Sequence, residues 1–197
     1  APGFIRLVSV AKSGLIGQIK NVDATFTKLV DGNIRELQAH TAGGSMTELA
    51  TYPLLAIIKL LGTNFDNIDY YSFMDEEKNI DLFTKINLTY DKAIASAKVG
   101  LGVKSEGDLI ISGTKGYVYV PSPWWKTEYF EVRYEEFSRN KKYYYKFEGD
   151  GLRYELAEFV SMIHKEYYQT YKLMPNDSVA INSVIEIYLK GENIKKI

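Results

Sequence analysis

Hydrophobic positions change their spacing several times along the chain, and each change marks an expected element. Apolar residues recur at helical spacing over residues 4–15, and Gly14 is suited to end that helix. Over residues 18–27 apolar and polar positions alternate, which is typical of a strand with one buried face. A long apolar helix is then predicted to run to Gly62. We expect a kink at Pro53, because proline has no backbone N–H to donate.

The chain after Gly62 is predicted to be mostly strand. Short runs of alternating apolar and polar residues follow one another and are separated by tight turns, which favours an antiparallel meander. Such alternation leaves one face of the sheet for solvent or for another surface. The expected strands cover residues 67–73, 82–90, 93–101, 106–112, 117–120, 129–134 and 142–147.

Two apolar stripes at helical spacing close the chain. The first covers residues 152–163 and the second covers residues 180–188, with Asp177 or Ser178 as N-cap and Gly191 as the stop. The order of elements predicts an α+β fold: a large open, mostly antiparallel β-sheet with helices packed on one face. No repeat, low-complexity tract or linker divides it, so residues 1–197 are expected to form a single domain.

Composition excludes several classes of function. The chain of 197 residues is 46% hydrophobic and 25% charged, as expected of a globular protein. A formal net charge of −1 gives no basic excess for a nucleic-acid partner. Cysteine is absent, which excludes disulfides and thiol nucleophiles. The apolar runs are too short to span a membrane and no signal peptide is evident, so a cytoplasmic location is expected. Because an initiating methionine is lacking, we expect a fragment or a processed product.

Familiar catalytic motifs are missing. No G-x-G-x-x-G follows a strand, and neither a Walker loop nor a G-x-S-x-G elbow occurs. The chain has two histidines, His40 and His164, which lie far apart in the sequence. We therefore expect no metal site.

The most informative segment is the start of the long helix, just after Gly43 and Gly44. Glu48 and Tyr52 are four residues apart, so a carboxylate and a phenol would lie on one helical face and could meet the same ligand. The alternative is structural. Glu48 would then be a first-turn residue favoured by the helix dipole, and Tyr52 a core aromatic residue with a satisfied hydroxyl.

Two further segments carry candidate binding residues. Trp124, Trp125 and Lys126 follow two prolines in an aromatic loop that suits stacking on a sugar ring beside a positive charge. The tryptophans could instead cap the end of the sheet or an interface. Arg153, at the start of a helix, could bind a carboxylate or phosphate, or form a surface ion pair.

Four segments together resemble the C-terminal domain of the Gfo/Idh/MocA oxidoreductase family, in the same order and over nearly the whole chain. The helix segment AGGSMTELATYPLLAIIKLLG is the longest of them. The others are GLIGQIKNVDATF, GDLIISGTKGYVYVP and GDGLRYELAEFVSMI.

This resemblance implies a fold and a chemistry. The family transfers hydride between NAD or NADP and a carbon of a sugar or related alcohol, and an N-terminal Rossmann domain binds the dinucleotide. Its C-terminal domain is an open α+β sheet that contacts the substrate and forms homo-oligomers through the open face. A lysine of the first domain and an Asp-x-x-x-His pair share acid–base work. Glu48 matches that aspartate, and Tyr52 matches that histidine. Trp124, Trp125 and Lys126 fall near the substrate pocket.

Two departures from the family pattern affect the expected chemistry. Glutamate for aspartate moves the carboxylate by about 1.5 Å. Tyrosine for histidine replaces a group with an ordinary pKa of about 6.5 by a group with an ordinary pKa of about 10. We therefore expect the substrate-binding and oligomerisation domain of a sugar dehydrogenase, with nucleotide-linked sugars among its candidate substrates. Without a Rossmann domain, this part alone would be inactive. The alternative is a noncatalytic carbohydrate-binding or scaffold relative that lacks a cofactor domain.

Overall fold

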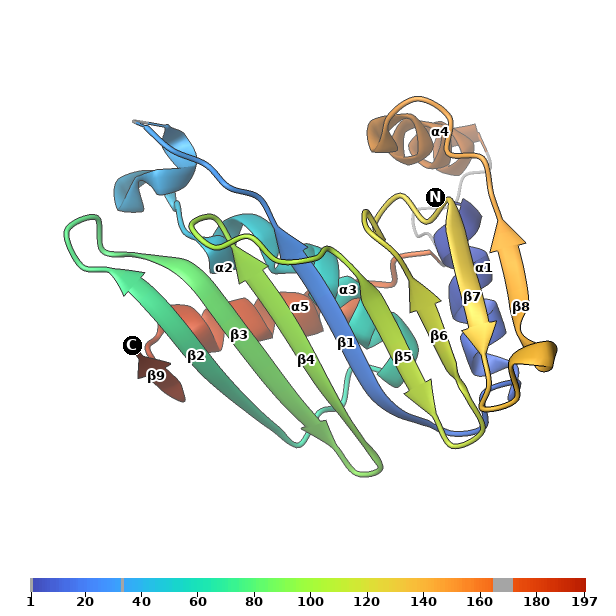
Figure 1. Ribbon diagram of the computed structural model, residues 1–197. Coiled ribbons are helices and arrows are strands. Elements are labelled where there is room, and N and C mark those ends of the chain that lie inside the picture. The colour runs from blue at the N-terminus through green and yellow to red at the C-terminus, as the bar shows by residue number, and fades with distance from the viewer. Residues whose placement is uncertain (1, 33, 165–171) are drawn as a thin grey trace.

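The structure, a computed structural model, describes residues 2–32, 34–164 and 172–197. Nine strands of this described chain form one open sheet with the order β8-β7-β6-β5-β1-β4-β3-β2-β9. Helices cover one side of it, and the other side is open (Figure 1). The expected α+β class, with a mostly antiparallel sheet and helices packed on one face, is confirmed.

The strands begin and end close to where the alternation of apolar residues predicts. They are β1 (Ile19–Thr27), β2 (Asn67–Asp75), β3 (Ile80–Tyr90), β4 (Ala93–Gly100), β5 (Leu109–Gly113), β6 (Tyr117–Val120), β7 (Tyr129–Arg133), β8 (Lys141–Tyr144) and β9 (Ile194–Lys196). The short β9 has no alternating run long enough to predict it, and it forms because it pairs with β2.

The sheet departs from a simple meander at two places. β1 lies between β4 and β5, parallel to β4 and antiparallel to β5. β9 lies parallel to β2 at the edge. Both strands come from the ends of the chain, far in sequence from their neighbours, so local turn signals give no information about their place in the sheet.

The helical elements lie near both ends of the chain, after β1 and, for one short 3₁₀ helix, between β7 and β8. The α-helices are α1 (Pro2–Lys12), α2 (Ser45–Leu49), α3 (Thr51–Leu61), α4 (Gly151–His164) and α5 (Pro175–Leu189), and the short 3₁₀ helices are η1 (Arg35–Leu37), η2 (Ala39–Thr41) and η3 (Phe137–Arg139). The expected long helix is divided at Ala50, three residues before Pro53, and Ala50 itself keeps right-handed helical angles (φ −64°, ψ −27°). Pro53 explains the break, because it cannot donate to the carbonyl of Leu49.

Helix α5 begins earlier than the sequence suggested. Its N-cap is Met174 rather than Asp177 or Ser178, and Pro175 occupies the first helical position, where a missing N–H costs nothing. Asp177 instead lies in the first turn and accepts the backbone N–H of Met174 at 2.8 Å.

The core lies between the sheet and helices α1, α3 and α5. Leu54 and Ile57 of α3 are fully buried against it, as are Val22 and Ile86 from the strands. Tyr70 on β2 is also buried, and its hydroxyl donates to the carbonyl of Val184 on α5 at 2.5 Å. Long apolar side chains from both layers therefore hold the helices against the sheet.

Helix α4 differs from the others because no residue of it is buried. Five large apolar side chains form one stripe along it, and each is about half exposed or more. They are Leu152 (59%), Leu156 (55%), Phe159 (57%), Val160 (48%) and Ile163 (61%). Helix α4 therefore leaves its apolar stripe exposed, unlike the helices that form the core with the sheet. The periodicity shows that the helix has an apolar face but does not show which surface covers it.

Candidate functional site

Helix α2 is held at its start by Asp81, a buried carboxylate on β3. Asp81 Oδ2 accepts the backbone N–H of Met46 at 2.9 Å and the hydroxyl of Thr84 at 2.6 Å. Burial raises the pKa of Asp81, although these two hydrogen bonds act in the opposite direction. Gly44, just before α2, has φ of +119°, and a Cβ there would lie 2.6 Å from Asp81 Oδ1. Glycine is therefore required at position 44, because its backbone φ is positive and because Asp81 leaves no room for a Cβ.

Glu48 of α2, a candidate catalytic residue, is held by an arginine that the sequence reasoning missed. Arg35 Nη1 and Nη2 donate to Glu48 Oε1 and Oε2, each at 2.7 Å. The Glu48 side chain is 17% exposed and that of Arg35 is 57% exposed. Hydrogen bonding to Glu48, followed by charge attraction, raises the pKa of the Arg35 guanidinium. The carboxylate therefore has a fixed orientation, and its remaining lone pairs can accept hydrogen bonds from a ligand.

Tyr52 of α3, the second candidate catalytic residue, is 47% exposed rather than a core residue. Its ring packs edge-on against Phe26 at the end of β1, with ring centroids 4.6 Å apart. Trp125 packs against the same Phe26 with centroids 4.2 Å apart. Phe26, Tyr52 and Trp125 thus form an aromatic corner, which leaves an accessible phenol beside two aromatic rings.

The two tryptophans have different environments. Trp124 is 3% exposed, and its indole N–H donates to the carbonyl of Thr25 at 2.8 Å. The prediction that Trp124 stacks on a sugar is therefore wrong, since burial and this hydrogen bond give it a structural role. Trp125 is half-buried, and a Cβ at Gly107 would lie 2.8 Å from its ring. The absence of a side chain at Gly107 makes room for the Trp125 ring in the aromatic corner.

Lys126 and Arg153 have different relations to this corner. Lys126 follows Trp125 directly and is exposed, in a turn whose Lys126 N–H donates to the carbonyl of Pro123 at 3.0 Å. Arg153 lies on α4 and pairs with Glu148 at 3.3 Å. Figure 1 shows α4 at the end of the molecule near β7 and β8, whereas α2 lies behind the β1–β4 half. Arg153 is therefore engaged in the surface ion pair that was its alternative role.

The arrangement offers an accessible phenol, a carboxylate with fixed orientation and an aromatic wall. These groups suit recognition of a polyol, because hydroxyls can donate to Glu48 while a sugar ring packs against the exposed aromatic surface. Within the part of the chain that the structure describes, no group of three or more histidine, aspartate or glutamate side chains could hold a metal ion. In those same residues, no helix is long and apolar enough to cross a membrane.

Comparison with known proteins identifies the class of fold. The structural neighbours are oxidoreductases of the Gfo/Idh/MocA type, matched over their C-terminal part, which confirms the fold implied by the sequence resemblance. KijD10, a 3-ketoreductase from Actinomadura kijaniata in complex with NADP and TDP-benzene, has a TM-score of 0.85 and 14% identity, with 100% of this chain and 61% of that chain covered. An aldose-aldose oxidoreductase from Caulobacter crescentus complexed with glycerol has a TM-score of 0.76 and 15% identity, with 95% and 57% covered.

These identities establish the fold and not the activity. This chain spans about 60% of the length of these neighbours. No family model matches the sequence, and no curated protein matches it.

Proposed function

We propose that this chain is the substrate-binding and oligomerisation domain of an NAD- or NADP-dependent sugar oxidoreductase that acts on a CH–OH group. The observation that carries the proposal is the exposed phenol of Tyr52 in the aromatic corner, one helical turn after the oriented Glu48. The fold of sugar oxidoreductases over the whole chain supports it. The neighbour solved with TDP-benzene makes nucleotide-linked sugars candidate substrates.

The proposed chemistry assigns a separate role to each side chain. Glu48 accepts hydrogen bonds from sugar hydroxyls, and Arg35 keeps its carboxylate in one orientation. Tyr52 relays the proton of the reacting hydroxyl, together with a lysine of a cofactor-binding domain. Trp125 limits the space for the sugar ring, and Lys126 lies at the edge of the same loop. A bound nicotinamide would accept or supply the hydride at the sugar carbon.

The proposal includes an N-terminal Rossmann domain that binds the cofactor, as a separate part of the same protein. A domain joined ahead of α1 would emerge beside the loop of Trp125, because a Cβ at Gly3 would lie 2.1 Å from the carbonyl oxygen of Thr127. The apolar stripe of α4 lies at this end of the molecule (Figure 1) and supports a covering partner there. We assign the cofactor-binding domain to that surface, because the structural neighbours are longer than this chain.

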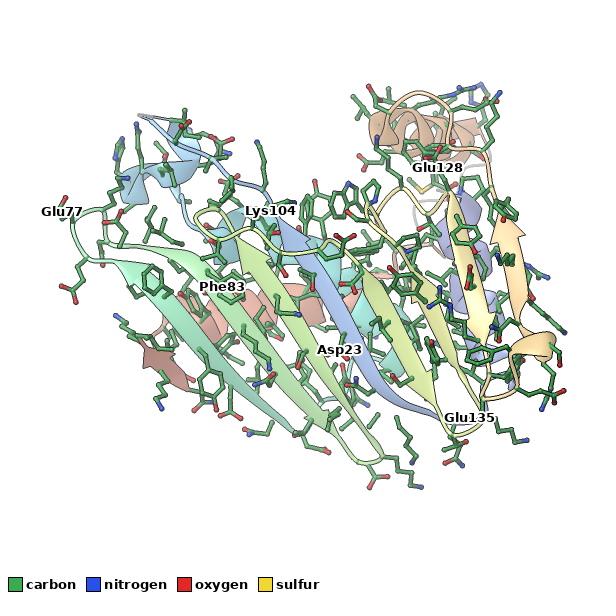
Figure 2. The ribbon with its side chains drawn as sticks, viewed as in Figure 1. Asp23, Glu77, Phe83, Lys104, Glu128 and Glu135 are labelled. Atoms are coloured by element: carbon green, nitrogen blue, oxygen red, sulfur yellow. The ribbon has the colours of Figure 1, made fainter. Side chains whose placement is uncertain are left out.

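The open face of the sheet is proposed as the surface of a homo-oligomer. Figure 2 shows the side chains of Asp23 and Phe83 on this face, away from the helices. Large apolar side chains are exposed on it among charged ones, a composition suited to burial against an identical face. They are Tyr71 (40%), Phe73 (49%), Ile94 (57%) and Tyr117 (38%).

The test of the catalytic proposal is Tyr52→Phe in the protein that carries this chain together with its cofactor-binding domain. Loss of the phenol should lower kcat by about 100-fold or more, the usual contribution of a general acid or base, and leave KM within about threefold. Tyr144→Phe, on the edge strand β8 and 72% exposed, is the matched control. Unchanged turnover in Tyr52→Phe would remove Tyr52 from the mechanism.

The alternative is a noncatalytic carbohydrate-binding protein that uses the Trp125 loop. The coding sequence upstream of Ala1 separates the two functions. An in-frame glycine-rich nucleotide loop and a Glu-Lys-Pro motif would support the enzyme, whereas a start codon next to Ala1 would support the binding protein. In the second case, calorimetry with a panel of sugars is the direct measurement.

A further inference from the structure

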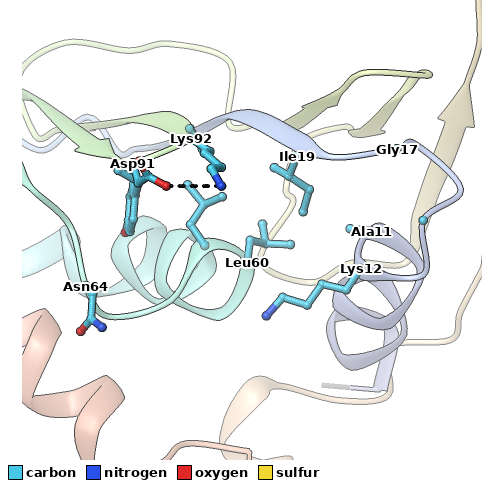
Figure 3. A pocket seen from close by; sticks show the side chains of 12 residues that line it. Ala11, Lys12, Gly17, Ile19, Leu60, Asn64, Asp91 and Lys92 are labelled. Atoms are coloured by element: carbon cyan, nitrogen blue, oxygen red, sulfur yellow. Dashed lines mark ion pairs between the residues drawn. The ribbon is translucent and has the colours of Figure 1, made fainter.

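A cavity of about 600 Å³ lies at the other end of β1 from the aromatic corner. Figure 3 shows the side chains that line it. The cavity lies between the ends of α1 and α3, the start of β1 and the β3–β4 turn. Ile19 lines this cavity, and Phe26 in the aromatic corner lies seven residues further along β1. At about 3.3 Å per residue, the two places are roughly 23 Å apart. The cavity is therefore independent of the candidate functional site.

The walls of the cavity combine an apolar floor with a charged rim. Leu60, Leu61 and Ile19 contribute aliphatic surface, and Leu60 is almost fully buried. Lys12 and Lys92 lie on the rim (Figure 3). The volume falls within the range of about 300–1,000 Å³ that is typical of pockets for small molecules.

The C-terminal ends of α1 and α3 carry partial negative charge, so they compete with an anionic ligand for the ammonium groups of the rim. The C-terminal carbonyls of a helix attract cations, and both α1 and α3 end here. Several of these carbonyls already accept hydrogen bonds. The Val10 carbonyl accepts the Ser13 hydroxyl at 2.7 Å, and the Ile58 carbonyl accepts the N–H of Gly62 at 2.8 Å. The hydroxyl of Tyr90 donates to the Gly62 carbonyl at 3.2 Å.

Positive groups outnumber negative ones around the opening. Asp91 is the one carboxylate among the lining residues in the described chain, and it lies 3.7 Å from Lys92, with both side chains largely exposed. Lys20 adds a third ammonium, held 3.1 Å from the carbonyl of Lys92. Lys12 also attracts Asp177 of α5, but Lys59 already pairs with that carboxylate at 2.6 Å.

We propose that this cavity binds a small organic anion, a carboxylate on an apolar body. The carboxylate would accept hydrogen bonds from Lys12 and Lys92, and the apolar body would rest on Leu60, Leu61 and Ile19. Burial on these side chains would stabilise the apolar body of the ligand. Charge-assisted hydrogen bonds at the rim would stabilise its carboxylate.

The test is a titration of the whole chain, labelled with ¹³C at leucine and isoleucine methyl groups, with 4-methylbenzoate. The matched neutral probe is 4-methylbenzyl alcohol. Binding should shift the methyl signals of Leu60, Leu61 and Ile19 and leave those of Leu152 unchanged. The carboxylate should bind about tenfold more tightly than the alcohol, as expected for charge-assisted hydrogen bonds.

Variants separate specific binding from general charge attraction. Lys12→Gln with Lys92→Gln should weaken the binding of 4-methylbenzoate by about tenfold. Lys195→Gln with Lys196→Gln removes the same net charge at the far edge of the sheet and should leave binding unchanged. The proposal is overturned by the absence of methyl shifts at the cavity, by equal affinity for the alcohol, or by equal weakening in both double variants.

Discussion

Arg35 holds both carboxylate oxygens of Glu48, with each guanidinium nitrogen 2.7 Å from its oxygen. This ion pair determines the charge that a ligand meets at the start of α2. Glu48 alone would present a negative charge, which attracts cationic ligands. With Arg35 in place, the pair is neutral overall, and the geometry favours uncharged hydroxyl groups.

Removing Arg35 is therefore expected to change ligand preference. In Arg35→Gln the charge of Glu48 has no partner. A ligand with an ammonium group should therefore bind more tightly relative to one with a hydroxyl group. We expect the affinity for glucosamine relative to glucose to rise by about fivefold, the upper range for a partly exposed ion pair. The ratio of the two dissociation constants, measured by calorimetry near about pH 6, checks this.

Arg35→Lys serves as the control, because it keeps the charge and loses only the two-pronged geometry. In Arg35→Lys, the affinity for glucosamine relative to glucose should stay close to that of the unmodified protein. An unchanged ratio in Arg35→Gln would contradict the charge role, whereas no binding of either sugar to the unmodified protein would count against the proposed function itself.

The two tryptophans should respond differently to substitution. Trp124→Phe removes a buried ring volume and the hydrogen bond to Thr25, so it should lower the free energy of unfolding by about 2–3 kcal/mol. Trp125→Phe should lower the free energy of unfolding by less, because Trp125 is only half-buried. Urea denaturation measures both.

Because the chain has two tryptophans, each variant contains a single fluorescent indole. A sugar that binds at the aromatic corner should change the fluorescence of Trp124→Phe, which retains Trp125. It should leave the fluorescence of Trp125→Phe nearly constant. The reverse result would place the ligand elsewhere.

Asp81 is expected to give stability a distinct pH dependence. Its pKa in the folded protein is raised above the ordinary 3.8 by burial, so the folded protein binds this proton more tightly than the unfolded chain. Asp81 therefore contributes stability below about pH 4, and this contribution is lost as the pH rises through the folded pKa. Asp81→Asn should gain stability relative to the unmodified protein as the pH rises from about 4 to 7.

Denaturation at several pH values measures this difference. Asp81→Ala is the informative comparison, because it leaves the N–H of Met46 and the hydroxyl of Thr84 without this acceptor. It should be destabilised by about 2 kcal/mol or more throughout the pH range. A constant difference between Asp81→Asn and the unmodified protein would show that Asp81 does not titrate in this range.

The open sheet face should control the oligomeric state. Phe73→Asp with Ile94→Asp places two charges on this face, where burial in an interface would be unfavourable. The expected result is a shift towards the monomer in sedimentation or light-scattering measurements. Leu189→Asp, at the exposed end of α5, is the matched control and should not shift the mass. An identical mass for all three proteins would contradict an interface on the open face.

Periodicity was sufficient to predict most elements. Alternating residues mark β3 and β4 because side chains of a strand point to opposite faces, and this pattern survives whatever the strand pairs with. The break before Pro53 also follows from covalent chemistry, since proline has no N–H. The candidate pair Glu48 and Tyr52 was found in the same local way, from a spacing of four residues.

The neighbours of that pair could not be found locally. Arg35 lies 13 residues before Glu48, in the short 3₁₀ helix η1, and Phe26 meets Tyr52 only because β1 ends beside the start of α3. The two tryptophans are adjacent in sequence, yet one is in the core and the other in the aromatic corner. Local pattern carries no information about such contacts, because they depend on segments brought together by folding.

The sequence by itself determined the α+β class, most strand and helix positions, the break before Pro53 and the candidate pair Glu48 and Tyr52, because these depend on side-chain period and backbone chemistry. Only the tertiary structure decided the insertion of β1 between β4 and β5, the pairing of Arg35 with Glu48 and the burial of Trp124. It also left the apolar stripe of α4 uncovered. These features arise from packing between distant segments, whose free energy no short stretch of residues encodes.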